Sequence, residues 1–236
     1  YNTFDLFEDG YGLNLRPLSV FANEVYADDP CLAFRPKDQF NINLYDTVDP
    51  DLGARMQKAM AVIQFKLEGQ LLRRRPEYGM DSRDLLGRMD YRKGTVTIDG
   101  REYPLRDSSF PTIDPEDPLR LSPGEEELMR ALTASFRHGV RLQRHMRFFI
   151  SHGKLYLRRN GLLLYHGCVP MTPEGEFARF TVDGRTLSGA ALFDYIQDKV
   201  REAWYLEYDS EAQVAARDFL WYLWCGRNSP LFGREK

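Results

Sequence analysis

The stretch LLLYHGCVP at residues 162–170 decides the first prediction about the fold. Its three leucines and tyrosine form a short apolar run, which is typical of a buried β-strand. His166 stands where this strand should end, Gly167 follows it, and Pro170 ends the run. Glycine lets the backbone turn or approach a ligand closely, and a neutral imidazole at the rim of a sheet commonly holds a divalent metal. We therefore expect His166 to bind a metal that activates water for hydrolysis; the alternative is a structural histidine bonded to a carbonyl.

Three dipeptides favour tight turns between short runs of strand-forming residues. Asn-Gly and Asp-Gly adopt the two-residue primed turns of β-hairpins, because both central positions need a positive φ. They predict hairpins with turns at Asn160-Gly161, Asp183-Gly184 and Asp99-Gly100, over residues 154–166, 177–187 and 95–105.

Apolar residues that recur every three or four positions predict the helices. The longest series, with Met56, Ile63 and Leu71 among its members, predicts one helix over 52–72, which ends before Pro76. Ser122, Pro123 and Glu125 predict a helix start with a capping box. Further helices are expected over 17–25 and 140–150, after a capping Ser188, and around 214–223.

The change from helical spacing to short hairpins near residue 150 predicts an α+β chain with three parts. Residues 1–51 are expected to be a helical and loop segment, and residues 52–150 a mostly helical insert with one small hairpin. Residues 151–236 are expected to supply β-hairpins and two helices of the core, with the strands near 151–187 in a central sheet and His166 at a strand end.

Composition bounds the class of protein. The chain has 236 residues, 43% of them hydrophobic and 13% aromatic, so it is expected to be globular rather than disordered. Its net charge of −3 gives no general attraction to nucleic acid or anionic lipid. No apolar run reaches the length of a membrane span, and no signal peptide opens the chain. Three distant cysteines form no disulfide framework, so we expect a reducing cytosol. Both ends are expected to be cuts inside a longer protein.

Several cationic and histidine side chains have competing interpretations. Arg227 and Arg234, in a Gly- and Pro-containing loop after an aromatic run, could bind an anion or serve solubility. The aromatic run itself is expected to be core, because base-stacking surfaces usually lie in a basic setting. The run at 73–75 is expected to be solvated at a helix C-terminus, with a phosphate clamp as the alternative. The remaining histidines, spaced by seven residues, are too far apart to share an ion on a helix and are expected on the surface or in packing: His138, His145 and His152.

With these residues laid out, the chain resembles the class 3 fructose-1,6-bisphosphatases, the type best known in Firmicutes. The resemblance covers essentially the whole chain. Its landmarks are LFEDGYGLNLRPL at 6–18, IQFKLEGQLLRRRPE at 63–77, FPTIDP at 110–115, LYHGCVP at 164–170 and WYLWCGRNSPLFG at 221–233.

The resemblance implies membership of the calcineurin-like metallophosphoesterases, with a two-layered β-sandwich, outer helices and a two-metal centre. His166-Gly167 matches the His-Gly of that superfamily, which carries a metal ligand. The motifs D-x-H, G-D-x-x-D-R, G-N-H and G-H-x are absent from this sequence. In the family they lie before the position of Tyr1 and after Lys236, which implies an internal segment that is inactive alone and holds no assigned catalytic residue.

The function implied is hydrolysis of the 1-phosphate of fructose 1,6-bisphosphate, with two ions of Mn²⁺, in cytoplasmic gluconeogenesis. The expected partner is a small sugar bisphosphate, with Arg227 and Arg234 as candidates for its phosphates, and no nucleic acid or membrane. Two alternatives stay open: a phosphoprotein or other phosphomonoester phosphatase on the same scaffold, and a non-catalytic sugar-phosphate-binding module.

Overall fold

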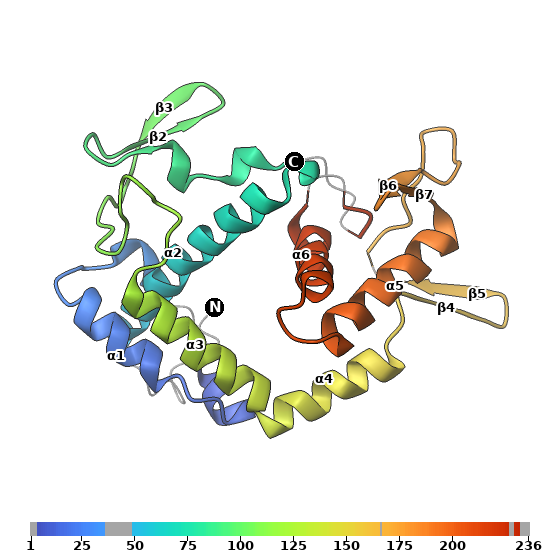
Figure 1. Ribbon diagram of the computed structural model, residues 1–236, viewed down its shortest axis with the longest axis horizontal. Coiled ribbons are helices and arrows are strands. Elements are labelled where there is room, and N and C mark those ends of the chain that lie inside the picture. The colour runs from blue at the N-terminus through green and yellow to red at the C-terminus, as the bar shows by residue number, and fades with distance from the viewer. Residues whose placement is uncertain (1–3, 36–48, 166, 227–228, 232–236) are drawn as a thin grey trace. The chain divides into compact units, whose positions relative to one another are not determined.

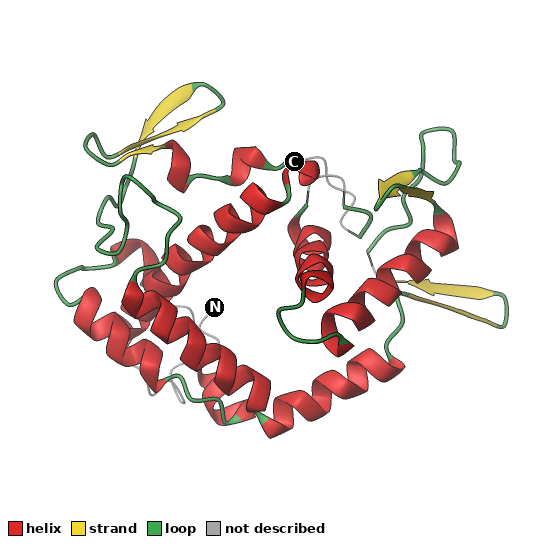
Figure 2. Ribbon diagram, viewed as in Figure 1, coloured by secondary structure: helices red, strands yellow, loops and turns green. Residues whose placement is uncertain are grey.

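The computed structural model describes residues 4–35, 49–165, 167–226 and 229–231. These residues form helices and small antiparallel sheets, which confirms the α+β class (Figures 1 and 2). The chain divides into two compact units: Tyr1–Arg74 with Asp81–His145, and Arg75–Met80 with Met146–Lys236. No helix in the described part has both the length and the apolar character needed to cross a bilayer.

Three helices build the first unit: α1 at Arg16–Val25, α2 at Pro50–Arg74 and α3 at Pro123–His138. A short helical turn at Leu6–Gly10 precedes α1, and others lie between the three helices, at Leu32–Phe34, Asp81–Arg83 and Leu86–Arg88. The predicted bounds of these helices are confirmed to within a few residues. Pro17 lies in the first turn of α1, and Pro76 follows shortly after the end of α2, as expected for a residue that starts helices well but cannot continue them.

The start of α3 shows how local chemistry selects a helix boundary. The Ser122 hydroxyl accepts from the Glu125 amide at 3.3 Å, and the Glu125 carboxylate accepts from the Ser122 amide at 2.7 Å. Both halves of the predicted capping box are therefore present, and Pro123 occupies the first turn.

The core of the first unit lies where the apolar faces of α1, α2 and α3 meet. Met56 and Ile63 of the predicted α2 face are buried in it, while Leu52, Met60 and Leu67 pack against it partly exposed. The other buried members are Phe4, Leu15, Leu18, Phe21, Ala22, Tyr26, Cys31, Ala54, Ala59, Leu128 and Leu132. The helical spacing of the sequence thus identified the buried side of α2.

That buried side also holds Lys58, which hydropathy alone does not place in a core. Its side chain is 1% exposed, and Nζ contacts Asp29 at 2.5 Å and Asp107 at 2.7 Å. Burial raises the pKa of the Asp29 carboxyl, but hydrogen bonds from Lys58 and the Cys31 amide outweigh this and lower the pKa to about 2. Lys58 therefore ties two loops that are distant in sequence to one helix.

Lys66, two turns further along α2, repeats this arrangement. Its side chain and that of Glu125 are both fully buried, and Nζ donates at 2.7 Å to the Glu125 carboxylate and at 2.7 Å to the Thr112 carbonyl. The Thr112 hydroxyl donates to the same carboxylate at 2.7 Å. This ion pair joins α2, α3 and the loop that contains FPTIDP, so it belongs to the tertiary framework of the first unit.

A three-stranded antiparallel sheet completes this unit, with strands β1 at Met89–Asp90, β2 at Thr95–Ile98 and β3 at Arg101–Pro104 in that order. The turn residues Asp99 and Gly100 have φ values of 48° and 75°, as a primed turn requires. The β2–β3 hairpin was predicted, whereas β1 was not, because two residues are too short to show a period of two.

Helix α4 at Val140–His152 crosses the boundary between the units, which falls after His145. After this helix, the described residues of the second unit form two separate hairpins and two further helices. The strands are β4 at Tyr156–Arg159, β5 at Leu162–Tyr165, β6 at Phe180–Val182 and β7 at Arg185–Leu187. The helices are α5 at Gly189–Tyr205 and α6 at Glu211–Cys225, and a short turn at Pro76–Tyr78 belongs to the same unit.

Helices α5 and α6 lie against each other and form the core of the second unit (Figure 1). Buried side chains on the two helices include Leu192, Phe193, Ile196, Ala216, Phe219, Tyr222 and Leu223. The predicted cap at Ser188 is wrong in one respect: Ser188 occupies the N-cap position, but its side chain makes no capping hydrogen bond. Gly189 follows with a φ of 53°, so the first turn is entered in a conformation that differs from a standard cap.

The prediction of a buried strand at 162–165 is wrong for the 236-residue chain. The hairpin exists, but Leu162, Leu163, Leu164 and Tyr165 are 66%, 51%, 57% and 50% exposed. The physical reason is that β5 pairs only with β4 within the described residues, and a two-stranded hairpin supplies no layer to cover its faces. The expected central sheet is likewise replaced, in the described part, by separate two- and three-stranded sheets.

Candidate functional site

The three predicted site residues, His166, Arg227 and Arg234, lie outside the described residues, so their roles stay predictions. The chain on the C-terminal side of His166 is described, as is the turn that follows residue 228. These two neighbouring segments come from the landmarks LYHGCVP and WYLWCGRNSPLFG, which the sequence presents as separate motifs.

The structure brings these two segments into contact. The Cys168 thiol donates to the Pro230 carbonyl at 2.9 Å, although the residues are 62 positions apart. Gly167 has a φ of 82°, and a Cβ at this position would overlap the carbonyl oxygen of Leu231. Only glycine combines this backbone conformation with this close approach. We refer to Gly167, Cys168 and Ser229–Leu231 as the loop junction.

The turn at Ser229 is held by the end of α6. Ser229 is 1% exposed, and its hydroxyl donates to the Leu223 carbonyl at 2.7 Å and accepts from the Leu231 amide at 3.3 Å. Its own amide donates to the Gly226 carbonyl at 3.1 Å. Leu223 lies in the last turn of α6, where carbonyl groups lack partners within the helix. Ser229 therefore satisfies the helix end and fixes the turn that touches Gly167.

Replacement of Gly167 by alanine in the full-length protein should destabilise the loop junction beyond the cost of the backbone conformation. A left-handed conformation costs an alanine about 1–2 kcal/mol, and overlap with the Leu231 carbonyl adds to this. Gly161→Ala is the matched control, because its φ is 79° and no atom lies within 4 Å of its added Cβ. Thermal unfolding of both variants measures the difference. Equal losses for the two variants would contradict a tight contact at the loop junction.

Arg75 corrects the prediction of a fully solvated cationic run at 73–75. Its side chain is 23% exposed, and Nε pairs at 2.9 Å with Asp218 of α6, which is 2% exposed. Burial lowers the pKa of the Arg75 guanidinium, but the hydrogen bond to Asp218 outweighs this and raises it. The ring of Tyr78 packs on Tyr222 at a centroid distance of 4.7 Å. Arg75 thus anchors residues 75–78 on α6, while Arg73 is 59% exposed and lies 3.8 Å from Asp117.

The aromatic run before the loop is core only in part. Tyr222 and Leu223 are buried, as expected, whereas Trp224 is 74% exposed. On a helix, adjacent residues point about 100° apart, so one face of the run packs against α5 and the other does not.

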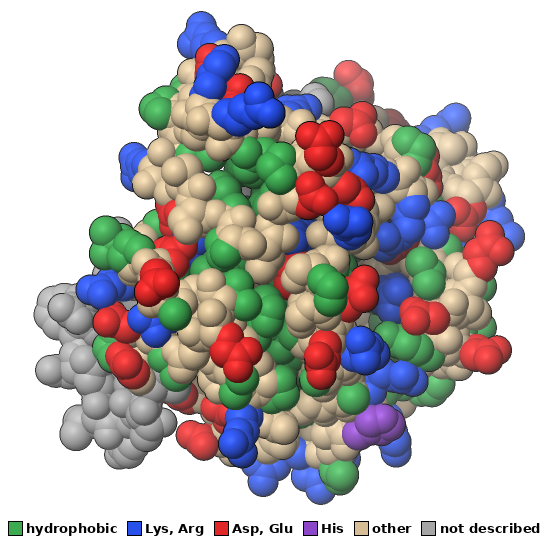
Figure 3. All heavy atoms as spheres, turned by 60° about the vertical axis from the view of Figure 1, so that its left-hand side comes forward, with side chains coloured by type: hydrophobic (Ala, Val, Ile, Leu, Met, Phe, Trp, Pro, Cys, Tyr) green, Lys and Arg blue, Asp and Glu red, His purple; other side chains and the backbone are tan. Residues whose placement is uncertain are grey.

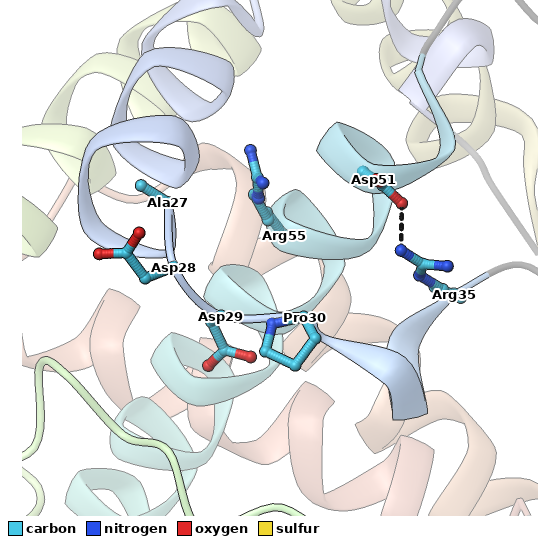
Figure 4. Close-up of a pocket in the computed structure, with 7 residues that line it drawn as sticks. All are labelled: Ala27, Asp28, Asp29, Pro30, Arg35, Asp51 and Arg55. Atoms are coloured by element: carbon cyan, nitrogen blue, oxygen red, sulfur yellow. Dashed lines mark ion pairs between the residues drawn. The ribbon is translucent and has the colours of Figure 1, made fainter.

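Two surface hollows lie in the first unit, and we do not assign either of them as a binding site. The first has a volume of about 170 Å³ and is lined by Arg35 and Asp51, among others. These two side chains form an ion pair, drawn as a dashed line in Figure 4, with an N–O distance of 2.6 Å. Arg55 bonds Asn23, and Asp29 pairs with Lys58, so these charges already have partners. The second, of about 330 Å³, is lined by Gln70, Arg73, Asp117, Leu119, Arg120, Leu121 and Glu126. On the face of the molecule drawn in Figure 3, acidic and basic side chains are interspersed, so neither sign of charge dominates that face.

The described residues do not contain a complete metal site. Among them, no three His, Cys, Asp or Glu side chains group together as ligands for an ion. His145 packs edge-on against Tyr11, with centroids 5.7 Å apart, and His152 stacks on Phe148 at 4.6 Å. These packing roles confirm the expectation for both histidines.

Comparisons with known proteins agree with the landmarks. The family model described as Firmicute fructose-1,6-bisphosphatase matches residues 1–236. The chain is 47% identical over 238 residues to the class 3 fructose-1,6-bisphosphatase of Alkaliphilus metalliredigens, covering 100% of this chain and 36% of that protein. It is 47% identical to the enzyme of the same name from Clostridium novyi over 235 residues, covering 99% of this chain and 35% of that protein. For Listeria monocytogenes the identity is 45% over 236 residues, with 100% and 36% covered.

No solved structure matches the chain. The chain spans about a third of the length of the curated relatives it matches. Because one family model and several relatives cover it from end to end, the chain belongs to the Firmicute fructose-1,6-bisphosphatase family.

Proposed function

We propose that the full-length protein hydrolyses the 1-phosphate of fructose 1,6-bisphosphate, with a role in gluconeogenesis in the cytoplasm. The observation that carries this proposal is the match of the family model to residues 1–236. The curated relatives that cover the whole chain are named class 3 fructose-1,6-bisphosphatases, which supports the same reaction.

In this proposal His166 is a ligand of a divalent ion, with Mn²⁺ the metal we favour and a metallophosphoesterase-like sandwich the scaffold. A pair of bound ions would polarise the phosphoryl oxygens and supply a hydroxide nucleophile at neutral pH. Since the described residues hold no complete ligand set, the remaining ligands are proposed to come from parts of the protein outside these 236 residues.

The loop junction supports the proposed roles of His166 and Arg227 by holding the backbone next to them, and it adds no reacting group itself. Gly167 directly follows His166, and Ser229 directly follows residues 227–228. The contact of Gly167 and Cys168 with residues 230–231 therefore restrains the chain beside both proposed functional positions. A ligand supported by neighbouring contacts keeps its geometry better than one on a free loop.

Arg227 and Arg234 are proposed to bind substrate phosphate. Guanidinium groups bind phosphate through two parallel hydrogen bonds, which position it as well as neutralise it. Each such contact, if made, contributes about 1.5–3 kcal/mol of binding.

The test is phosphate release by the purified full-length protein loaded with Mn²⁺. Fructose 1,6-bisphosphate, a phosphoserine peptide and p-nitrophenyl phosphate are compared at equal concentration. We expect selective release from fructose 1,6-bisphosphate and formation of fructose 6-phosphate. Preference for the peptide or for the aryl phosphate would indicate another phosphatase, and binding of the sugar bisphosphate without release would indicate a binding module.

A further inference from the structure

Charge is distributed unevenly along the chain. Residues 128–173 contain eight Lys and Arg and no Asp or Glu, and all four histidines lie in the same stretch. Since the whole chain carries a net charge of −3, the remaining residues together carry −11. The expectation of no nucleic-acid partner rested on the net charge, which averages over this distribution. A local basic surface can therefore exist in a chain that is acidic overall.

Helix α4 lies in the middle of this basic stretch, and none of its residues is fully buried. Arg141, Arg144 and Arg147 follow one another at a spacing of three, which places them within about 120° on one side of the helix. All three are exposed. Arg141 donates to the Gly10 carbonyl at 2.5 Å and keeps its charge. Among the described residues, Arg144 and Arg147 have no hydrogen-bond or ion-pair partner, so their guanidinium groups are available to an anion.

Exposed aromatic rings accompany these guanidinium groups. Phe148 is 62% exposed and stacks on the exposed ring of His152, with centroids 4.6 Å apart and planes at 18°. Phe149 is 64% exposed and meets Phe148 edge-on at a centroid distance of 6.3 Å. Phe148 lies one turn beyond Arg144, so cations and rings occur together on the solvent side of one helix. We refer to these residues as the α4 strip: Arg141, Arg144, Arg147, Phe148, Phe149 and His152.

We propose that the α4 strip binds single-stranded nucleic acid in the full-length protein. Its guanidinium groups neutralise backbone phosphates, and its rings stack on unpaired bases, which is the combination that single-strand-binding surfaces use. Every base has a π-face, so the strip binds with little sequence preference. The proposal is independent of the reaction proposed above.

Two other polyanions fit the strip less well. A helix that lies on an anionic membrane turns its apolar side to the lipid. In α4 the apolar residues Leu142, Met146 and Ile150 lie on the side away from Arg144 and are partly buried. An acidic peptide would pair with the guanidinium groups, but its carboxylates have no flat π-face to cover the rings. Nucleic acid is the polyanion that matches both halves of the strip.

The experiment measures binding to the full-length protein by fluorescence anisotropy. The probes are a labelled oligouridylate and the matching oligothymidylate, each about 12 nucleotides long, which is within the site size of single-strand-binding folds. Three phosphate contacts predict a slope of about −2 for the logarithm of the association constant against that of the salt concentration. This slope corresponds to a roughly 20-fold loss of affinity between about 50 and 200 mM salt. Binding of either probe in this way supports the proposal, and the tighter one identifies the preferred nucleic acid.

Three variants separate charge from stacking. Arg144→Gln combined with Arg147→Gln should reduce the slope to about −0.7, because one phosphate contact is left. Phe148→Leu keeps an apolar side chain without a ring, and should weaken binding about tenfold at an unchanged slope. The matched control is Arg101→Gln combined with Arg106→Gln, which makes the same change in net charge at two exposed arginines outside α4. It should keep the affinity of the unaltered protein. All of these side chains are exposed, so thermal unfolding should stay the same in each variant.

Absence of binding to both oligonucleotides at about 50 mM salt would overturn the proposal. Equal affinity for a polyglutamate peptide of the same charge, or unchanged affinity in Phe148→Leu, would also overturn it, because the strip would then be a general anion surface. Binding to vesicles that contain phosphatidylglycerol, without binding to the oligonucleotides, would overturn it in favour of a membrane surface.

Discussion

Lys66→Met in the full-length protein is expected to lower the free energy of local unfolding of α2 by about 3–5 kcal/mol. The substitution leaves the carboxylate of Glu125 fully buried without its cation, and neither residue is exposed to solvent. Thr112 and the Ser122 amide still donate to that carboxylate, but these neutral groups do not compensate its charge. Hydrogen exchange of the α2 amides measures the effect.

Two further variants separate the buried charge from other causes. Lys66→Met combined with Glu125→Gln should recover much of the loss, because glutamine can still complete the capping box and no charge is left buried. Arg120→Met breaks an exposed ion pair with Asp114, whose contact is 2.7 Å, and should cost at most about 1 kcal/mol. If Lys66→Met costs no more than Arg120→Met, the buried pair has no special role in stability.

His166→Ala in the full-length protein is expected to lose one bound ion and most of the phosphatase activity. Partners that only orient a metal ligand change affinity or activity by about 10–100-fold when replaced, so loss of a ligand itself should exceed about a hundredfold. The motivating observation is the strand-His-Gly signature, together with the loop junction beside it. Metal content and phosphate release are measured on the same preparation.

The matched control is His138→Ala, since His138 is an exposed residue at the end of α3. It should keep both the metal content and the activity of the unaltered protein. Wild-type values for His166→Ala in both measurements would make His166 a structural residue. Loss of activity with full metal content would instead point to a role in the reaction other than metal binding.

The elements that sequence predicted well depend on residues close together in the chain. The capping box at Ser122, the primed turns at Asp99-Gly100 and Asn160-Gly161, and the spacing of apolar residues in α2 each act within a few positions. These features specify where an element begins, turns or ends, whatever it later packs against. The α+β class follows from them.

Burial was less predictable, because the same residue types occur on covered and uncovered surfaces. Lys58 and Lys66 are in the core since carboxylates from distant loops accompany them, which no pattern within α2 indicates. Leu162 to Tyr165 were predicted to be buried, yet these residues are at least half exposed, and no layer of the described residues covers them. The apolar run still specifies the strand, because strand formation depends on local residue type, whereas burial depends on which other segments pack against it.

The sequence by itself determined the helices and hairpins, the family, and the candidacy of His166, because these rest on local backbone preferences and on motifs read in order. Only the tertiary structure decided that Cys168 meets Pro230 across 62 positions, that Lys66 meets Glu125 across 59, and that Gly167 fits against Leu231. Such contacts depend on where the folded chain returns in space. The free energy that selects them comes from burial and from pairing of polar groups after the local elements have formed, so spacing along the chain does not encode them.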